Sequence, residues 1–288
     1  MQQERWAKGV EIAQPGRVSP RLVALIRRWL LPAVRLLWRP TLTGTENLPV
    51  NGPFLLVANH SAGIGAAEIH CFLALYLAQV GPDRPLAGFA LPLGFRVWPL
   101  SALHRELGTI PSSYAAAEAT LARGVPILIF PGGDHESLAP VWLANRVDFA
   151  GRLGFLHIAR AAGVPIVPLG IRGGSLTAPI LLRAKWLANL LVLPRFVLGV
   201  KRWGVSLLGL LVAILLGAFL PVTWPLRAAL IWLWLGSPLI FLPWVPWTVR
   251  MRIGPPLAAA DLFGEGADTE LPRALARVEA AVQAQVAR

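Results

Sequence analysis

A chain of 288 residues is long enough to bury a sizeable core, and its composition is unusually apolar: 55% of the residues are hydrophobic and 15% are charged, against roughly 25% charged in an average soluble domain. The net charge of +12 comes from 24 Arg and three Lys, which lie beside apolar and Trp-rich runs and so favour anionic lipid headgroups over nucleic acid. A single cysteine, Cys71, excludes an intramolecular disulfide.

Near the N-terminus, residues 21–38 combine apolar side chains with four arginines, a pattern typical of an amphipathic helix. We expect this helix to lie on a membrane surface, and packing against the protein's own domain is the alternative. Pro32 is expected to kink it, because proline removes a backbone hydrogen bond from a helix interior.

The middle of the chain alternates between short apolar runs and helical stretches. Each apolar run is bounded by Pro or Gly, as buried strands are. This alternation predicts an α/β fold, with a largely parallel sheet that helices cover on both faces. The predicted strands are 53–58, 85–90, 125–130 and 164–171, and the predicted helices are 66–80, 112–123 and 151–162, the last ending at Gly163.

Two apolar runs follow this region. Residues 203–220 are 18 uncharged residues, which as one helix would extend about 27 Å, close to the thickness of a hydrocarbon core. The second run, 228–247, carries four Trp and three Pro. Together they predict an apolar hairpin that spans or enters a membrane, and two buried helices of a soluble domain are the alternative.

Basic residues flank the hairpin on both sides, with Lys201 and Arg202 before it and Arg250 and Arg252 after it. The positive-inside rule then places both ends on the cytoplasmic face of a membrane, which in a bacterium is the inner membrane. We divide the chain into an N-terminal segment with the surface helix (1–43), a catalytic α/β core (44–185), a membrane-associated or transmembrane hairpin insertion (186–247), and a return strand with a C-terminal helix (248–288).

Polar residues follow two of the predicted strands. Asn59 and His60 come directly after the first strand, and FPGGDHES, residues 130–137, comes at the end of the third. Because parallel strands end at one sheet edge, where open α/β sheets bind ligands, these segments should meet there. A histidine beside a carboxylate can act as a general base, and the N–H groups of Gly132 and Gly133 can approach an oxyanion. The candidate carboxylates are Glu68, Asp134 and Glu136.

No protein nucleophile is evident in the sequence. Ser61 is not part of a G-x-S-x-G motif, and Cys71 lies in an apolar stretch. The histidines lack the spacing of a metal site, so we expect no metal, and GIGAAE lacks the third glycine of a dinucleotide loop. A base without a protein nucleophile predicts direct attack by a hydroxyl or amine of the substrate.

Segments within residues 44–174 resemble, in order and spacing, the four sequence blocks of the glycerolipid (lysophospholipid) acyltransferase superfamily. The three segments that carry this resemblance are GTENLPVNGPFLLVANHS, LGTIPSSYAAAEATLARGVPILIFPGGDHES and GFLHIARAAGVPIVPLGIRGG. The Pro-Gly-Gly with a later Glu is most similar to the monoacylglycerol/diacylglycerol acyltransferase-like branch. The resemblance implies an acyltransferase fold, a role in lipid metabolism and phospholipid biosynthesis, acyl-CoA or acyl-carrier protein as co-substrate, and no bound cofactor.

The resemblance also implies roles for individual residues. His60 matches the catalytic histidine, which deprotonates the acceptor hydroxyl. Most members place an aspartate five positions later, where this chain has Gly65, and Glu68 is then the expected catalytic partner. The residues expected to bind substrate are Asn59, Ser61, Gly108, Ser112, Phe130, Pro131, Gly132, Gly133 and Glu136.

Members with phosphate-bearing acceptors commonly carry arginines in the second and third blocks, which here read GTIPSS and PGGDHE. Their absence favours a neutral acceptor, although Arg96, Arg105 or Arg172 could contact a phosphate. We therefore predict a membrane-bound O-acyltransferase whose partners are an anionic lipid bilayer, the thioester donor and a lipid acceptor. A lipid hydrolase that uses the same histidine and a non-catalytic lipid-binding protein are the alternatives.

Overall fold

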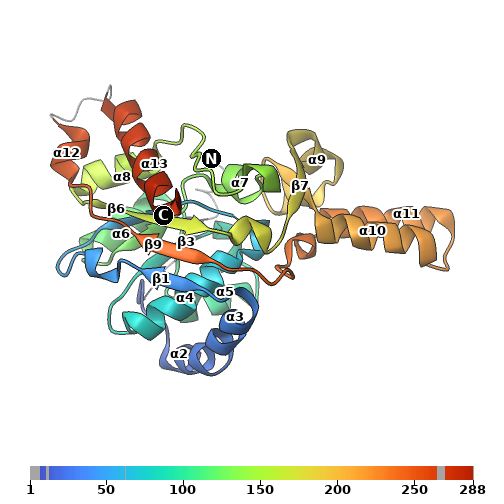
Figure 1. The fold of residues 1–288 in the computed structure, drawn as a ribbon, viewed down its shortest axis with the longest axis horizontal. Coiled ribbons are helices and arrows are strands. Elements are labelled where there is room, and N and C mark those ends of the chain that lie inside the picture. Colours follow the sequence, from blue (N-terminus) through green and yellow to red (C-terminus); the bar gives the residue numbers. More distant parts are fainter. Residues whose placement is uncertain (1–6, 11–12, 62, 265–269, 288) are drawn as a thin grey trace.

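The structure is a computed structural model that describes residues 7–10, 13–61, 63–264 and 270–287. At its centre lies a seven-stranded sheet in the order β1-β9-β6-β2-β5-β3-β4 (Figure 1). The strands from β6 to β4 run parallel, whereas β9 is antiparallel to β6 and parallel to β1. The strands are β1 (Thr41–Thr43), β2 (Leu55–Ala58), β3 (Ala87–Ala90), β4 (Ile110–Pro111), β5 (Ile127–Ile129), β6 (Ile166–Arg172) and β9 (Arg250–Ile253).

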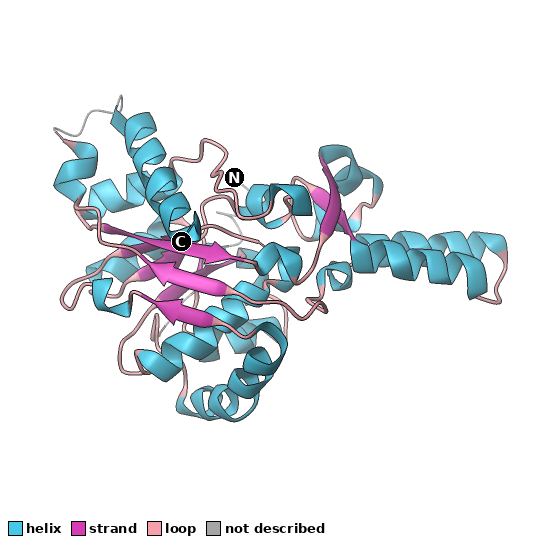
Figure 2. Cartoon of the chain, viewed as in Figure 1, coloured by secondary structure: helices cyan, strands magenta, loops and turns pink. Residues whose placement is uncertain are grey.

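Helices cover both faces of this sheet (Figure 2), which confirms the predicted α/β fold class. The side chains of β2 alternate between the two faces: Leu55 and Val57 pack into one core, and Leu56 and Ala58 into the other. All four are fully buried, so the strand reads as a continuous apolar run. One helical layer contains α2 (Pro20–Leu25), α3 (Leu31–Trp38) and α4 (Ala67–Gln79), and the other α6 (Tyr114–Ala122), α8 (Gly154–Ala162), α12 (Ala259–Phe263) and α13 (Leu271–Ala287).

The N-terminal helix packs on the domain with one face and exposes apolar side chains on the other. Val23 and Val34 are buried in the core beside α4, whereas Trp29 is 65% and Leu36 80% exposed. Between α2 and α3 the chain forms a π-helical turn at Ile26–Leu30. Pro32, the second residue of α3, lies just after this turn and has no backbone N–H for a helical hydrogen bond.

The predicted continuous 18-residue apolar helix at 203–220 is wrong. Its first four residues form β8 (Trp203–Ser206), which pairs antiparallel with β7 (Ile180–Ala184). The Ser206 hydroxyl accepts a hydrogen bond from Gly209 N at 2.9 Å, so α10 (Leu207–Phe219) begins only after it. The two-stranded sheet crosses the boundary expected at residue 185.

Helix α10 packs against α11 (Trp224–Gly236), and the two extend side by side away from the sheet (Figure 2). Each has 13 residues and is therefore about 20 Å long. None of the helices in the described part of the chain combines the length and the hydropathy that crossing a membrane requires.

Candidate active site

Asn59 joins the ends of the two central strands. Its Nδ2 donates to the Ile171 carbonyl at 2.8 Å, and its Oδ1 accepts from Ile171 N at 2.7 Å, so the side chain bridges β2 to β6. The residue is only 4% exposed. Both ends of the amide are engaged with backbone, and Asn59 thereby fixes the point at which His60 leaves the sheet.

His60 and Glu68 form a hydrogen-bonded pair at this edge, with 2.7 Å between His60 Nδ1 and Glu68 Oε1. The same carboxylate oxygen accepts from Ser61 N at 2.8 Å. Because the carboxylate only accepts hydrogen bonds, the ring proton belongs on Nδ1, and the lone pair of Nε2 remains available as a base. The His60 side chain is 16% exposed, whereas Glu68 is fully buried.

The local fold explains why the carboxylate stands eight positions after His60. A 3₁₀ turn at Gly63–Gly65 is followed by Ala66, whose φ of 42° is left-handed, and Glu68 then lies in the first turn of α4. A Cβ on Gly65 would lie 2.1 Å from the Phe241 carbonyl oxygen, so this position has no room for an aspartate. Among the three candidate carboxylates, Glu68 is the one in contact with the His60 ring.

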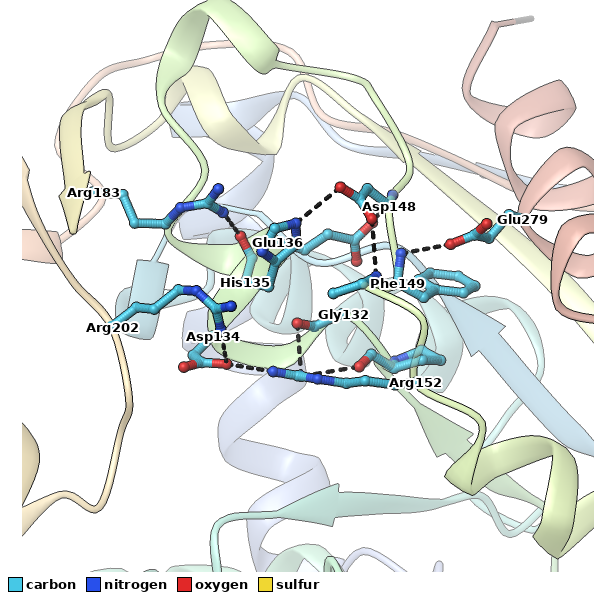
Figure 3. Close-up of polar contacts among 12 residues, drawn as sticks. Gly132, Asp134, His135, Glu136, Asp148, Phe149, Arg152, Arg183, Arg202 and Glu279 are labelled. Carbon is cyan, nitrogen blue, oxygen red and sulfur yellow. Dashed lines mark hydrogen bonds and ion pairs between the residues drawn. The ribbon is translucent and has the colours of Figure 1, made fainter. Parts of the chain in front are cut away.

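Glu136 lies on α7 (Gly133–Ser137) and contacts the backbone of His60 instead of its ring. Its Oε2 accepts from His60 N at 2.9 Å. Its Oε1 accepts from Asp148 N at 3.0 Å, and Figure 3 shows the two side chains together. A Cβ on Gly132 would lie 2.3 Å from Oε2, so the approach of the carboxylate requires glycine there. Burial raises the pKa of Glu136 to about 8, although the two N–H donors act in the opposite direction.

Helix α13 supports the segment that contains Asp148. Glu279 accepts from Phe149 N at 2.7 Å (Figure 3), and Gln283 accepts from Val147 N at 2.9 Å and donates to the Asn145 carbonyl at 3.1 Å. These contacts connect the C-terminal helix, through the 145–149 segment and Glu136, to the backbone of His60.

Aromatic and glycine residues of the third segment lie beside the pair. The Phe130 ring is 4.8 Å from the His60 ring between centroids. The Gly133 N–H, expected to be available to an oxyanion, donates to the Phe130 carbonyl at 3.2 Å and is already engaged. Arg152 Nη1 donates to the Pro131 carbonyl at 3.1 Å and to the Gly132 carbonyl at 2.8 Å; Figure 3 shows Arg152 beside Gly132.

Asp134 points to cations and not to His60. Its Oδ1 is 2.5 Å from Arg152 Nη2 and 3.7 Å from Arg202 Nη1 (Figure 3). These two arginines were missing from the sequence-based site. From the sequence alone, Arg202 is only a basic flank of the hairpin, and Arg152 lies outside every motif.

The remaining expected residues differ in their placement. Ser112 follows β4 and so lies at the carboxyl edge, where its N–H donates to the Ala90 carbonyl at 3.0 Å. Gly108 precedes β4 and ends α5 (Leu100–Leu107), which puts it at the opposite edge, away from His60. Ser61 Oγ is buried without a hydrogen-bond partner among the described residues, and a Cβ on Gly174 would lie 2.1 Å from it.

Comparisons with known proteins agree with this architecture. Residues 39–172 match the Acyltransferase family model. The fold is similar to the crystal structure of the 1-acyl-sn-glycerophosphate (LPA) acyltransferase PlsC from Thermotoga maritima, with a TM-score of 0.52 and 18% identity, covering 93% of this chain and 80% of that chain. The segment that matches this family model runs from β1 to the end of β6 and contains the His60–Glu68 pair.

Curated relatives are found in mycobacteria. The chain is 29% identical over 180 residues to an uncharacterized protein of Mycobacterium tuberculosis, which covers 62% of this chain and 48% of that protein. It is also 29% identical over 174 residues to an uncharacterized protein of Mycobacterium leprae, covering 60% of this chain and 47% of that protein. The chain thus spans about half the length of the curated relatives that it matches.

Proposed function

We propose that this protein transfers a fatty acyl group from a thioester donor to the hydroxyl, or amine, of a lipid acceptor, with His60 as the general base. The observation that carries this proposal is the 2.7 Å contact between His60 Nδ1 and the buried Glu68, because a neutral ring with its proton on Nδ1 offers the lone pair of Nε2 to an incoming hydroxyl. We assign Glu68 the role of holding the ring tautomer and stabilising the imidazolium.

In the proposed reaction His60 Nε2 takes the proton of the acceptor hydroxyl, and the oxygen of that hydroxyl attacks the carbonyl carbon of the thioester. The tetrahedral intermediate collapses, the C–S bond breaks, and the imidazolium returns the proton to the departing thiolate. Ser61 Oγ makes no hydrogen bond to His60, which favours this direct transfer over an acyl-serine intermediate. The donor is acyl-CoA or acyl-carrier protein, and the reaction requires no metal or bound cofactor.

We also propose an anionic lipid bilayer as a partner, at the cytoplasmic face of a membrane. Phe219 and Trp224, at the far end of the hairpin, are 76% and 73% exposed. Arg227 donates to the Gly217 and Leu220 carbonyls at 2.9 and 2.6 Å, so the end of α10 does not depend on water for these hydrogen bonds. Exposed Trp29 on the N-terminal helix would provide a second contact.

The test is acyl transfer in liposomes with wild-type protein and His60→Ala, using labelled acyl-CoA or acyl-carrier protein and a panel of neutral and phosphorylated lipid acceptors. Loss of a general base should reduce turnover by about 10²-fold or more while the melting temperature is unchanged. His157→Ala is the matched control, because among the described residues no hydrogen bond or ion pair joins His157, on α8, to His60, Glu68 or Glu136.

Product analysis separates the alternatives. Acylated acceptor identifies a transferase, and free fatty acid that forms without acceptor identifies a hydrolase. Equal turnover by wild-type protein and His60→Ala would remove His60 from the mechanism. If wild-type protein binds liposomes but transfers acyl groups to no acceptor in the panel, lipid binding without catalysis replaces the proposal.

A further inference from the structure

A strongly basic cavity of about 420 Å³ lies next to the loop that carries Gly132, because Arg152 both lines the cavity and donates to the Gly132 carbonyl. It is formed where the start of α8, helix α9 (Lys185–Leu190) and the segment before β8 come together. The residues that line this basic pocket are Ala150, Arg152, Lys185, Asn189, Arg195, Lys201 and Arg202.

Five cations line the basic pocket, and no carboxylate does. Asp134, beside it, is the acid that pairs with Arg152 and Arg202 in the described part of the chain, at 2.5 and 3.7 Å. Within the described residues, no acid lies within ion-pair distance of Lys185 or Lys201. The pocket therefore has an excess of positive charge, and its cations repel one another. A bound anion would offset this repulsion.

A neighbouring arginine shows the same electrostatic effect. Arg183 lies close by on β7 and donates to the His135 carbonyl (Figure 3). Burial lowers the pKa of Arg183, and the charge of Arg202 lowers it further. The positive field therefore extends over the strands at the base of the hairpin.

The basic pocket is connected to the active site through one loop. Arg152 Nη1 donates to the Pro131 and Gly132 carbonyls, at 3.1 and 2.8 Å, and the preceding Phe130 ring packs against His60. Figure 3 shows Arg152 and Arg202 meeting at Asp134, beside the Gly132 turn. A ligand held by these guanidinium groups would thus lie next to the loop that borders the reacting atoms.

We infer that the basic pocket binds a phosphate group of a substrate. The two sources with this chemistry are the nucleotide end of an acyl-CoA donor and the phosphorylated headgroup of a lipid. Planar guanidinium forks suit phosphate oxygens, and the cavity volume is in the range of small-ligand sites. Most of its cations lie beyond residues 39–172, outside the segment that the family model matches, and the identification of the ligand as a substrate rests on the proposed acyl transfer.

The test measures equilibrium binding by calorimetry, without any acyl transfer, for two probes: adenosine 3′,5′-bisphosphate and glycerol 3-phosphate. The double variant Lys185→Gln/Lys201→Gln alters two exposed side chains and should keep the fold. Its affinity for the occupying probe should fall by about 10-fold or more, as should that of Arg202→Gln. Arg273→Gln, at an exposed position on α13, is the matched control and should bind as wild type does.

Asp134→Asn provides a test of opposite sign. It removes the carboxylate that competes for Arg152 and Arg202 and keeps the size of the side chain, so probe affinity should rise by several-fold. A merely structural role for this cluster would not produce tighter binding. Higher salt should weaken probe binding in every protein, because the contacts are between charges.

The source of the phosphate follows from which probe binds and from the kinetics. If the nucleotide end is bound, the lysine double variant raises KM for acyl-CoA but not for acyl-pantetheine. If a lipid headgroup is bound, the lysine double variant raises KM only for the phosphorylated acceptor. Absence of binding by both probes, or equal binding by wild type and the double variant, would overturn the inference. Wild-type protein that binds a probe but transfers no acyl group would instead refute the proposed function alone.

Discussion

Replacing Glu68 by Gln separates the two roles assigned to this side chain. The Gln carbonyl oxygen can occupy the position of Oε1 and still accept from His60 Nδ1 and Ser61 N, which lie 2.7 and 2.8 Å from it. The ring orientation and tautomer are thus retained, and the negative charge is lost. The imidazolium that forms during proton transfer would then face a neutral amide.

The magnitude follows from the geometry. The charge centres of an imidazolium and a carboxylate in this contact are about 4 Å apart, and at an effective dielectric constant of about 20 their attraction is about 4 kcal/mol. Glu68 is fully buried, so solvent screens the pair little. Losing this stabilisation in the transition state corresponds to a fall of about 10²- to 10³-fold in kcat/KM.

The assay is acyl transfer by wild type, Glu68→Gln and the control Glu118→Gln, which removes a carboxylate from an exposed position on α6. Melting temperatures show whether each protein is folded at the assay temperature. A folded Glu68→Gln protein that retains more than about a third of wild-type kcat/KM would show that the charge does not assist proton transfer, and the reasoning would fail.

Three further outcomes concern stability. Gly65→Ala should destabilise the fold by about 1 to 3 kcal/mol in urea unfolding, because its Cβ would lie 2.1 Å from the Phe241 carbonyl oxygen; an unchanged midpoint would show that this contact is not rigid. Asn59→Ala should cost about 2 to 4 kcal/mol, because it leaves two buried backbone groups of Ile171 unpaired, and a loss below about 1 kcal/mol would contradict that. For Glu136, burial raises the folded-state pKa from 4.5 to about 8. The stability contributed by its protonated form is full below about pH 4.5 and is lost as the pH rises through about 8, so Glu136→Gln should flatten this part of the stability profile; unchanged pH slopes would exclude the assignment.

The parts of the fold that sequence reasoning predicted are those with strong local signals. Strands buried on both faces, such as β2, read as apolar runs, and the left-handed Gly163 marks the end of α8 as expected. The missed elements lack such signals. Strand β4 has two residues, and β8 lies within an apolar run whose composition equally suits a helix. There the hydroxyl of Ser206 decides where the helix begins.

The candidate site divides in the same way. The sheet topology was sufficient to bring the His60 and 130–137 segments to one edge, because it depends only on strand direction. Glu68 was the expected partner of His60, but the reason for its eight-residue spacing lies in the left-handed Ala66 and in the lack of space at Gly65, which the sequence does not show. The role of Arg152 was also hidden, because it contacts Asp134 and two backbone carbonyls of a loop about 20 residues earlier, and no motif marks these contacts.

The support that α13 gives to the loop behind His60 has a consequence for how the molecule is made. The hydrogen bonds from Val147 and Phe149 to this helix join residues 136 and 130 positions apart in sequence. During synthesis on the ribosome, strands β2 and β5 and the His60–Glu68 pair emerge long before α13 does. The growing chain can therefore pair β2 with β5 early, but β9 joins the sheet late, and the support of the candidate active site is completed only when the last described helix has been released.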